Sequence, residues 1–120
     1  MKKATLVLGA SLKEDRYSNI VIHRLKEKNQ NVFAFGMQEG TIAGVPVDVQ
    51  LKKYSNIDTV TLYLNPMRQE ALYGYIIDLQ PRRVIFNPGT ENDVFAKLLQ
   101  EKGIECEVAC TLVLLATQQY

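Results

Sequence analysis

Short apolar runs recur along the chain, and between them apolar and charged residues mix with the spacing of amphipathic helices. The runs cover residues 4–8, 31–35, 59–64, 83–86 and 105–109. The first four begin about 25 residues apart, which is the length of one strand-plus-helix unit. They are continuously apolar more than alternating, as is typical of parallel strands that are covered on both faces. The pattern predicts an α/β fold, with a doubly wound, mainly parallel sheet of five strands and helices on both faces.

Three of the intervening segments carry the signals of helix ends. Ser18 is the expected N-cap of the first helix, and Asn65 is the expected N-cap of the second. Thr90 is expected to cap the third, which Gly103 would end in the left-handed conformation. The apolar residues of this third helix are expected to be buried; they are Val94, Phe95, Leu98 and Leu99.

One segment breaks the alternation of strands and helices. Residues 37–58 contain two glycines and a proline around short β-like pieces. We interpret them as a turn, a short strand near residues 45–49 and a loop or single helical turn around residues 51–54. The apolar tail, residues 111–120, fits a closing helix, a strand or a dimer contact.

Composition narrows the class of protein. The 120 residues suit one domain spanning residues 1–120. A net charge of +1 gives no electrostatic argument for a nucleic acid or an anionic membrane as partner. No apolar run is long enough for a transmembrane helix. The start of the chain imitates a signal peptide, but its apolar stretch is short and charged residues follow, so we expect a first strand and a cytoplasmic protein.

The segment after the first run, Gly9-Ala10-Ser11, is a candidate phosphate-binding loop. Open α/β sheets bind ligands beyond the carboxyl ends of their strands. The dinucleotide fingerprint is incomplete, because Ser11 and Glu14 stand where its second and third glycines would be. A side chain at Gly9 would meet a ligand or strain the turn, and the helix that follows offers free N–H groups. Lys13 and Arg16 add positive charge, although an ordinary loop with surface charges explains the same residues.

The segments after the later runs also reach this edge of the sheet. NAD enzymes usually place an acidic residue at the end of the second strand, whereas this chain has Phe35-Gly36-Met37 there. The missing carboxylate disfavours NAD and suits an adenine or a phosphorylated ribose. The later segments, Leu64-Asn65-Pro66 and Asn87-Pro88-Gly89, fit either the walls of a cleft or simple helix caps.

Several motifs in order carry a resemblance to a known family. They are "VLGAS", "YSNIVIHRL", "GTIAGVPV", "TVTLYLNP", "VIFNPGTEN" and "GIECEVACTLV". With them the chain resembles small stand-alone CoA-binding proteins, and it is similar to the N-terminal CoA-binding domain of the succinyl-CoA synthetase alpha subunit. The resemblance implies a Rossmann-like fold, with coenzyme A along the carboxyl edge of the sheet and its diphosphate near the first loop.

The resemblance also implies which residues bind the coenzyme. Those near its ADP part are Gly9, Ala10, Ser11, Arg16, Tyr17, Ser18 and Asn19. Those near the adenosine are Phe35, Gly36 and Met37, and those along the pantetheine are Leu64, Asn65, Pro66, Asn87, Pro88 and Gly89. The chain departs from its relatives after the second strand, where Gln38 and Glu39 follow instead of a basic residue.

The sequence shows no catalytic constellation. Cys106 and Cys110 lack a second Cys or His pair, so we expect neither a zinc site nor a disulfide framework. His23 is the only histidine and fits a plain helix position. The resemblance implies binding of CoA or an acyl-CoA as a small-molecule ligand without turnover. The alternatives are a small nucleotide-dependent enzyme, either an NAD(P) reductase or an acyl transferase, and a regulatory subunit that senses acyl-CoA. The apolar C-terminus favours a homodimer.

Overall fold

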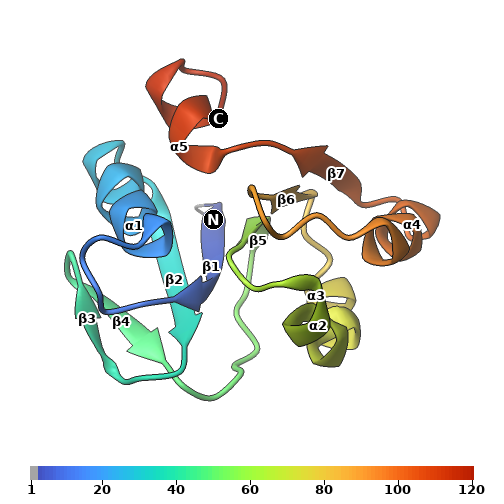
Figure 1. The fold of residues 1–120 in the computed structure, drawn as a ribbon, viewed down its shortest axis with the longest axis horizontal. Helices are drawn as coiled ribbons and strands as arrows, with labels where there is room; N and C mark the ends of the chain where they lie inside the picture. Colours follow the sequence, from blue (N-terminus) through green and yellow to red (C-terminus); the bar gives the residue numbers. More distant parts are fainter. Residues whose placement is uncertain (1–2) are drawn as a thin grey trace.

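A twisted sheet with helices on both faces forms the body of the molecule (Figure 1). The computed structural model describes residues 3–120, and these contain a seven-stranded sheet of order β3-β4-β2-β1-β5-β6-β7. Five of the parallel strands are β1 (Ala4–Ala10), β2 (Asn31–Gly36), β5 (Ile57–Leu62), β6 (Arg83–Phe86) and β7 (Glu105–Val108). They coincide with the five apolar runs, which confirms the α/β, Rossmann-like prediction.

Two further strands extend the sheet beyond β2. β4 (Val45–Asp48) pairs with β2 in parallel, and it confirms the short strand expected near residues 45–49. β3 (Gly40–Ile42) pairs with β4 in antiparallel orientation, across a turn in which Ala43 and Gly44 both have positive φ. We expected a turn instead of β3 and a sheet of five strands. β3 was missed because a three-residue strand is too short to show a period.

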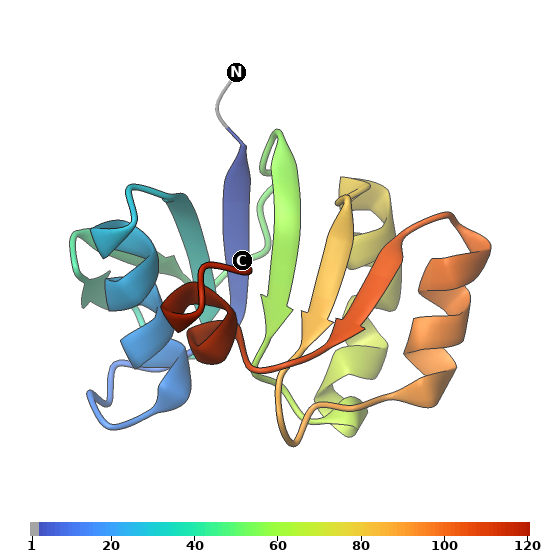
Figure 2. The ribbon, with the colours of Figure 1, turned by 90° about the horizontal axis from the view of Figure 1, so that it is seen from above.

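Side chains of the parallel strands point alternately to the two faces, so each face has its own core. One core packs residues such as Leu6 of β1 against η1 (Glu70–Leu72), α3 (Tyr73–Leu79) and α4 (Asp93–Glu101). The short helix α2 (Pro66–Gln69) directly precedes η1. The other packs Val7 of β1 against α1 (Tyr17–Glu27) and α5 (Thr111–Ala116). Figure 2 shows α1 and α5 in front of the sheet and the other helices on its far side.

Some expected helix ends are confirmed. The side chain of Asn65 caps α2 by accepting a hydrogen bond from the N–H of Arg68 at 2.9 Å, and Gly103 has a φ of +76° after α4. The tail forms a helix, α5, which decides between the alternatives of helix and strand. These ends are specified by local interactions, which sequence patterns report well.

Other expectations about the helices were wrong. Ser18 is a buried residue inside α1, which begins one residue earlier with Arg16 at the N-cap. Asn92 caps α4, because its side chain accepts from the N–H of Phe95, while Thr90 donates its hydroxyl to the carbonyl of Asn87. Val94 is 66% exposed and Leu98 37% exposed, because α4 lies beside the edge strand β7 and buries a narrower stripe.

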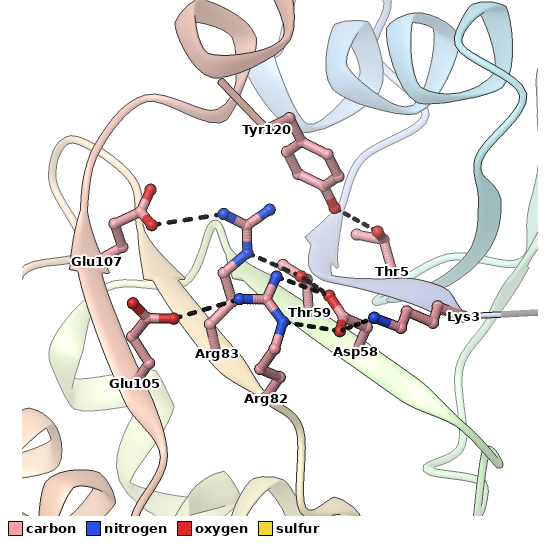
Figure 3. A network of polar contacts seen from close by, with 9 residues as sticks. All are labelled: Lys3, Thr5, Asp58, Thr59, Arg82, Arg83, Glu105, Glu107 and Tyr120. Carbon is pink, nitrogen blue, oxygen red and sulfur yellow. Dashed lines mark hydrogen bonds and ion pairs between the residues drawn. The ribbon is translucent and has the colours of Figure 1, made fainter. Parts of the chain in front are cut away.

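A polar network lies at the amino ends of the parallel strands (Figure 3). The side chain of Arg83 is 6% exposed, and its Nε donates to Thr59 Oγ1 at 2.9 Å. Its Nη1 lies 3.4 Å from Glu107 Oε1, and its guanidinium carbon lies 4.6 Å from the centre of the Tyr120 ring. Tyr120 in turn shares a hydrogen bond with Thr5. The network therefore connects Tyr120, at the C-terminus, to four strands of the sheet: β1, β5, β6 and β7.

Candidate functional site

A cleft of about 1230 Å³ opens at the opposite, carboxyl edge of the parallel strands. Its walls are the loop between β1 and α1, the end of β2, and the segment that leads from β5 through α2 into η1. Typical sites for small organic ligands measure roughly 300–1,000 Å³. The cleft is therefore large enough for an extended ligand, and it lies where sheets of this topology bind nucleotides.

Most of the residues that we expected at a ligand site line this cleft. They are Gly9, Ala10, Ser11, Arg16, Tyr17, Ser18, Phe35, Gly36, Met37, Leu64 and Pro88. The fold thus brings together segments from the first loop, the end of β2 and the ends of β5 and β6. Which ligand atoms each residue contacts stays a prediction.

The remaining expected residues lie outside the lining, two of them buried and three exposed. Asn19 is buried and donates from Nδ2 to the carbonyl of Ser11 at 2.9 Å, which holds the first loop in place. Asn87 is also buried, donates to Thr61 and the carbonyl of Leu62, and accepts from the N–H of Thr111. The last three take part in local turns and caps: Asn65 caps α2, Pro66 is its first residue, and Gly89 has a φ of +91°.

Several lining residues did not appear among the expected ones. They are Leu12, Lys13, Asp15, Gln38, Val49, Tyr63, Arg68, Ala71 and Leu72. Lys13 had been considered only for its charge. Arg68 follows Asn65-Pro66 by one helical turn, so its position after a strand end was a usable signal. Val49 comes from the irregular segment after β4, for which the sequence offered no signal.

Two glycines let the strand ends that form the floor of the cleft approach one another. Gly9 has a φ of +98°, and a Cβ there would lie 2.9 Å from the carbonyl carbon and oxygen of Tyr63. A Cβ on Gly36 would lie 2.3 Å from the carbonyl oxygen of Ala10. Gly9 has the positive φ that a turn would need, but it lies within β1, where the pairing with β2 shifts register between Leu8 and Ala10. The neighbour that excludes a side chain is Tyr63, directly after β5. Substitutions of Gly9 therefore disturb the fold before they report on a ligand.

The amino end of α1 presents hydrogen-bond donors to the cleft. Within residues 3–120, the N–H groups of Tyr17 and Ser18 have no acceptor, and the first turn of α1 contains no acidic residue. The hydroxyl of Ser11 accepts from the N–H of Lys13 at 3.2 Å, which leaves its own proton available to donate. Together with the positive end of the helix dipole, these groups form a site that suits an anion.

Charged side chains around the cleft are mostly positive. Lys13, Arg16 and Arg68 line it, and Asp15 is the only carboxylate residue among the lining residues that the structure describes. Glu39, which follows the second strand where relatives have a basic residue, lies outside the lining. Burial raises the pKa of the Tyr63 phenol, so this lining residue adds no negative charge at neutral pH. The cleft therefore favours anionic ligands.

Comparison with known proteins identifies the family. The family model described as "CoA binding domain" matches residues 3–116. The chain belongs to this family of CoA-binding domains. The match covers all seven strands and every residue that lines the cleft. None of the curated proteins matches this CoA-binding domain.

Several solved structures share the fold of this chain. An uncharacterized protein is 40% identical, with a TM-score of 0.95 over 100% of this chain and 99% of its own. A hypothetical protein from Pyrococcus horikoshii OT3 is 23% identical, with a TM-score of 0.85 over 98% of this chain and 84% of its own. A protein from Thermus thermophilus is 22% identical, with a TM-score of 0.83 over 99% and 91%. At these low identities, the likeness to the last two proteins shows a shared fold and nothing more.

Two kinds of feature are absent from residues 3–120 of this CoA-binding domain. No group of three or more His, Cys, Asp and Glu side chains in this part of the chain could hold a metal ion. No helix there is both long and apolar enough to cross a membrane.

Proposed function

We propose that the chain binds coenzyme A, or an acyl-CoA, in the cleft at the carboxyl edge of the sheet and does not itself transform it. The observation that supports this most is the amino end of α1, where unpaired N–H groups and Arg16 line a cleft whose volume is large enough for an extended nucleotide. Membership of the CoA-binding domain family supports the choice of ligand.

The diphosphate would lie against the first loop and α1. The N–H groups of Tyr17 and Ser18 and the hydroxyl of Ser11 can donate to phosphate oxygens, and Arg16 can add a bidentate, charge-assisted contact. Within residues 3–120 no carboxylate forms an ion pair with Arg16. Its guanidinium therefore does not have to leave an internal partner when the ligand binds.

The two arms of the coenzyme would follow the two walls of the cleft. Phe35 and Val49 offer apolar surface to the adenine beside the end of β2. Leu64, Leu72 and Pro88 line the cleft on the side of β5 and β6, where the uncharged pantetheine arm would lie. An apolar floor with a few polar groups at one end is the usual composition of a ligand site.

The proposal of binding without turnover comes from the chemistry of the lining. The described lining residues include neither a histidine nor a cysteine, and their only carboxylate belongs to Asp15, in the exposed loop. Cys110 is the N-cap of α5 and lies outside the lining. Acyl transfer needs a nucleophile beside a base, and the lining does not contain such a pair.

Calorimetry at fixed ionic strength tests the proposal. The parent protein is expected to bind coenzyme A, to be stabilised by it against heat, and to be stabilised less by NAD. Arg16→Gln should weaken the binding of coenzyme A about tenfold, since one charge-assisted contact is lost. Arg24→Gln is the matched control, because Arg24 belongs to the same helix but pairs with Glu27, outside the cleft.

Three results would contradict the proposal. The first is the absence of coenzyme A binding by the parent, and the second is equal or greater stabilisation by NAD. The third is hydrolysis or transfer of the acyl group when acetyl-CoA is incubated with the purified protein, measured as release of free thiol. Arg16→Gln with unchanged affinity would show that the first loop is not the diphosphate site.

A further inference from the structure

The arginines of this chain divide into two groups. Arg24, Arg82 and Arg83 each form an ion pair with a carboxylate, at 3.3, 2.9 and 3.4 Å respectively. Arg16 and Arg68 form no ion pair within residues 3–120, and both line the cleft. Arg16 already has a role beside the diphosphate in the proposed function. Arg68 is a second guanidinium, on a different element, for which that function assigns no partner.

Arg68 reaches across the cleft from the wall to which it belongs. It lies in α2, after β5, and its backbone N–H is bonded to the side chain of Asn65. Its guanidinium contacts the Sδ atom of Met37, the residue that directly follows β2. Met37 is 77% exposed, so this contact lies at the open surface of the cleft. A thioether is only a weak acceptor, and a phosphate oxygen that reached this point would replace it.

The end of the second strand is where sheets of this topology hold the ribose of a bound nucleotide. A carboxylate there accepts hydrogen bonds from the ribose hydroxyls, whereas an arginine accommodates a phosphate on the ribose. In this chain the lining residues at the end of β2 are Phe35, Gly36, Met37 and Gln38, and Arg68 is the charged group placed beside them.

We infer that Arg68 binds a phosphate group on the ribose of the nucleotide and makes the site selective for phosphorylated ribose. The inference rests on the proposed function, which places the adenosine of coenzyme A at this end of the cleft. Coenzyme A carries such a phosphate on the 3′ oxygen, and NADP carries one on the 2′ oxygen. The shared chemistry is a ribose monophosphate, and the proposed function assigns it to coenzyme A.

Four ligands separate these possibilities in calorimetry at fixed salt: coenzyme A, dephospho-CoA, NADP and NAD. The parent is expected to bind coenzyme A about tenfold or more tightly than dephospho-CoA, because one charge-assisted contact is lost with the phosphate. Arg68→Gln should lose this preference, because the binding of coenzyme A weakens while the binding of dephospho-CoA does not. Arg68→Lys should retain part of it, since the charge remains without the bidentate geometry. Arg24→Gln, outside the cleft, should keep the full preference.

The outcomes distinguish this inference from the proposed function. Equal affinities of the parent for coenzyme A and dephospho-CoA would overturn the inference and leave the proposed function standing, and this comparison needs no variant. A uniform loss of both affinities in Arg68→Gln would also overturn it. Preference for NADP over NAD that disappears in Arg68→Gln, without binding of coenzyme A, would support the ribose phosphate site and overturn the proposed function. Binding of none of the four ligands would overturn both.

Discussion

The two ends of the parallel strands hold arginines in opposite circumstances. At the amino ends, Arg82 and Arg83 form hydrogen bonds and ion pairs with Asp58, Thr59, Glu105 and Glu107 (Figure 3). At the carboxyl ends, Arg16 and Arg68 face the cleft without an internal carboxylate among the described residues. Arginine side chains thus connect strands at the amino edge of the sheet, whereas at the carboxyl edge they remain available to a ligand.

The difference has a physical consequence. Removing one member of a buried ionic network leaves the other member desolvated and unpaired, which costs stability. Removing an exposed cation without a partner costs little stability, but it removes attraction for an anionic ligand. Substitutions at the amino edge should therefore change folding, and those at the carboxyl edge should change binding.

The largest expected effect is at Arg83. Arg83→Met keeps the apolar part of the side chain but removes its bonds to Thr59 and Glu107 and its contact with the Tyr120 ring. We expect the free energy of unfolding to fall by about 3 kcal/mol, at the low end of values for broken buried pairs because Glu107 is partly exposed. Urea denaturation measures the change. Arg24→Met, in an exposed pair, should cost less than about 1 kcal/mol, and equal costs would refute the contrast.

The next effect concerns the floor of the cleft. Gly9→Ala places a Cβ at 2.9 Å from backbone atoms of Tyr63 at a φ of +98°. We expect a loss of about 2 kcal/mol or more in the free energy of unfolding, from strain in the backbone and from separation of the strand ends. Gly89→Ala is the control, because its φ is +91° but its Cβ would meet nothing within 4 Å. It should cost about 1 kcal/mol, so similar losses would show that the contact with Tyr63 is unimportant.

Gly9 also shows where sequence reasoning succeeds and where it stops. A glycine directly after a buried strand predicts a special backbone, and local signals such as the Asn65 cap or the five apolar runs predict elements correctly. The neighbour that requires the glycine, Tyr63, is more than fifty residues away in the chain, and no local pattern reports it.

The candidate site divides in the same way. Residues that directly follow strands, such as Ser11 and Met37, could be predicted because the topology brings all strand ends to one edge. Val49 lines the cleft through the path of the longer segment after β4, and no periodicity in the sequence specifies that path. The N-cap of α4 was misplaced because Thr90 and Asn92 are both good caps, and tertiary hydrogen bonds from Asn92 to Gln69 and Tyr73 favour Asn92.

A smaller effect is expected from pH at the amino edge. Burial opposes ionisation of Asp58, but hydrogen bonds from Arg82 and Thr59 outweigh it and hold the pKa of Asp58 below its ordinary value. A lowered pKa in the folded state stabilises the protein above the unfolded value, about 3.9 for aspartate, and this stabilisation is lost as the pH falls through the folded pKa. Asp58→Asn should therefore be less stable than the parent at pH 7, by about 0.5–1 kcal/mol, and equally stable near pH 2.

Denaturation curves at several pH values measure this difference. Asp78→Asn is the control, because Asp78 is exposed and forms no ion pair within residues 3–120. Its difference from the parent should not follow the same pH dependence. A constant gap between Asp58→Asn and the parent over the whole range would mean that ionisation of Asp58 does not contribute to stability.

The smallest effect on stability is expected for the two arginines of the cleft. It gives the most direct test of the difference between the two edges of the sheet. Arg16→Gln and Arg68→Gln should change the free energy of unfolding by no more than about 0.5 kcal/mol without ligand, because both side chains are exposed and leave no desolvated partner behind. The rise in melting temperature on adding coenzyme A should nevertheless shrink in both, since ligand stabilisation depends on affinity. Arg24→Gln should keep the full rise.

Added salt should reduce the rise in melting temperature in the parent more than in either cleft variant, because each variant has lost one attraction that salt screens. If instead the cleft variants lose intrinsic stability as Arg83→Met does, these arginines belong to the folding network and the division between the two edges is wrong.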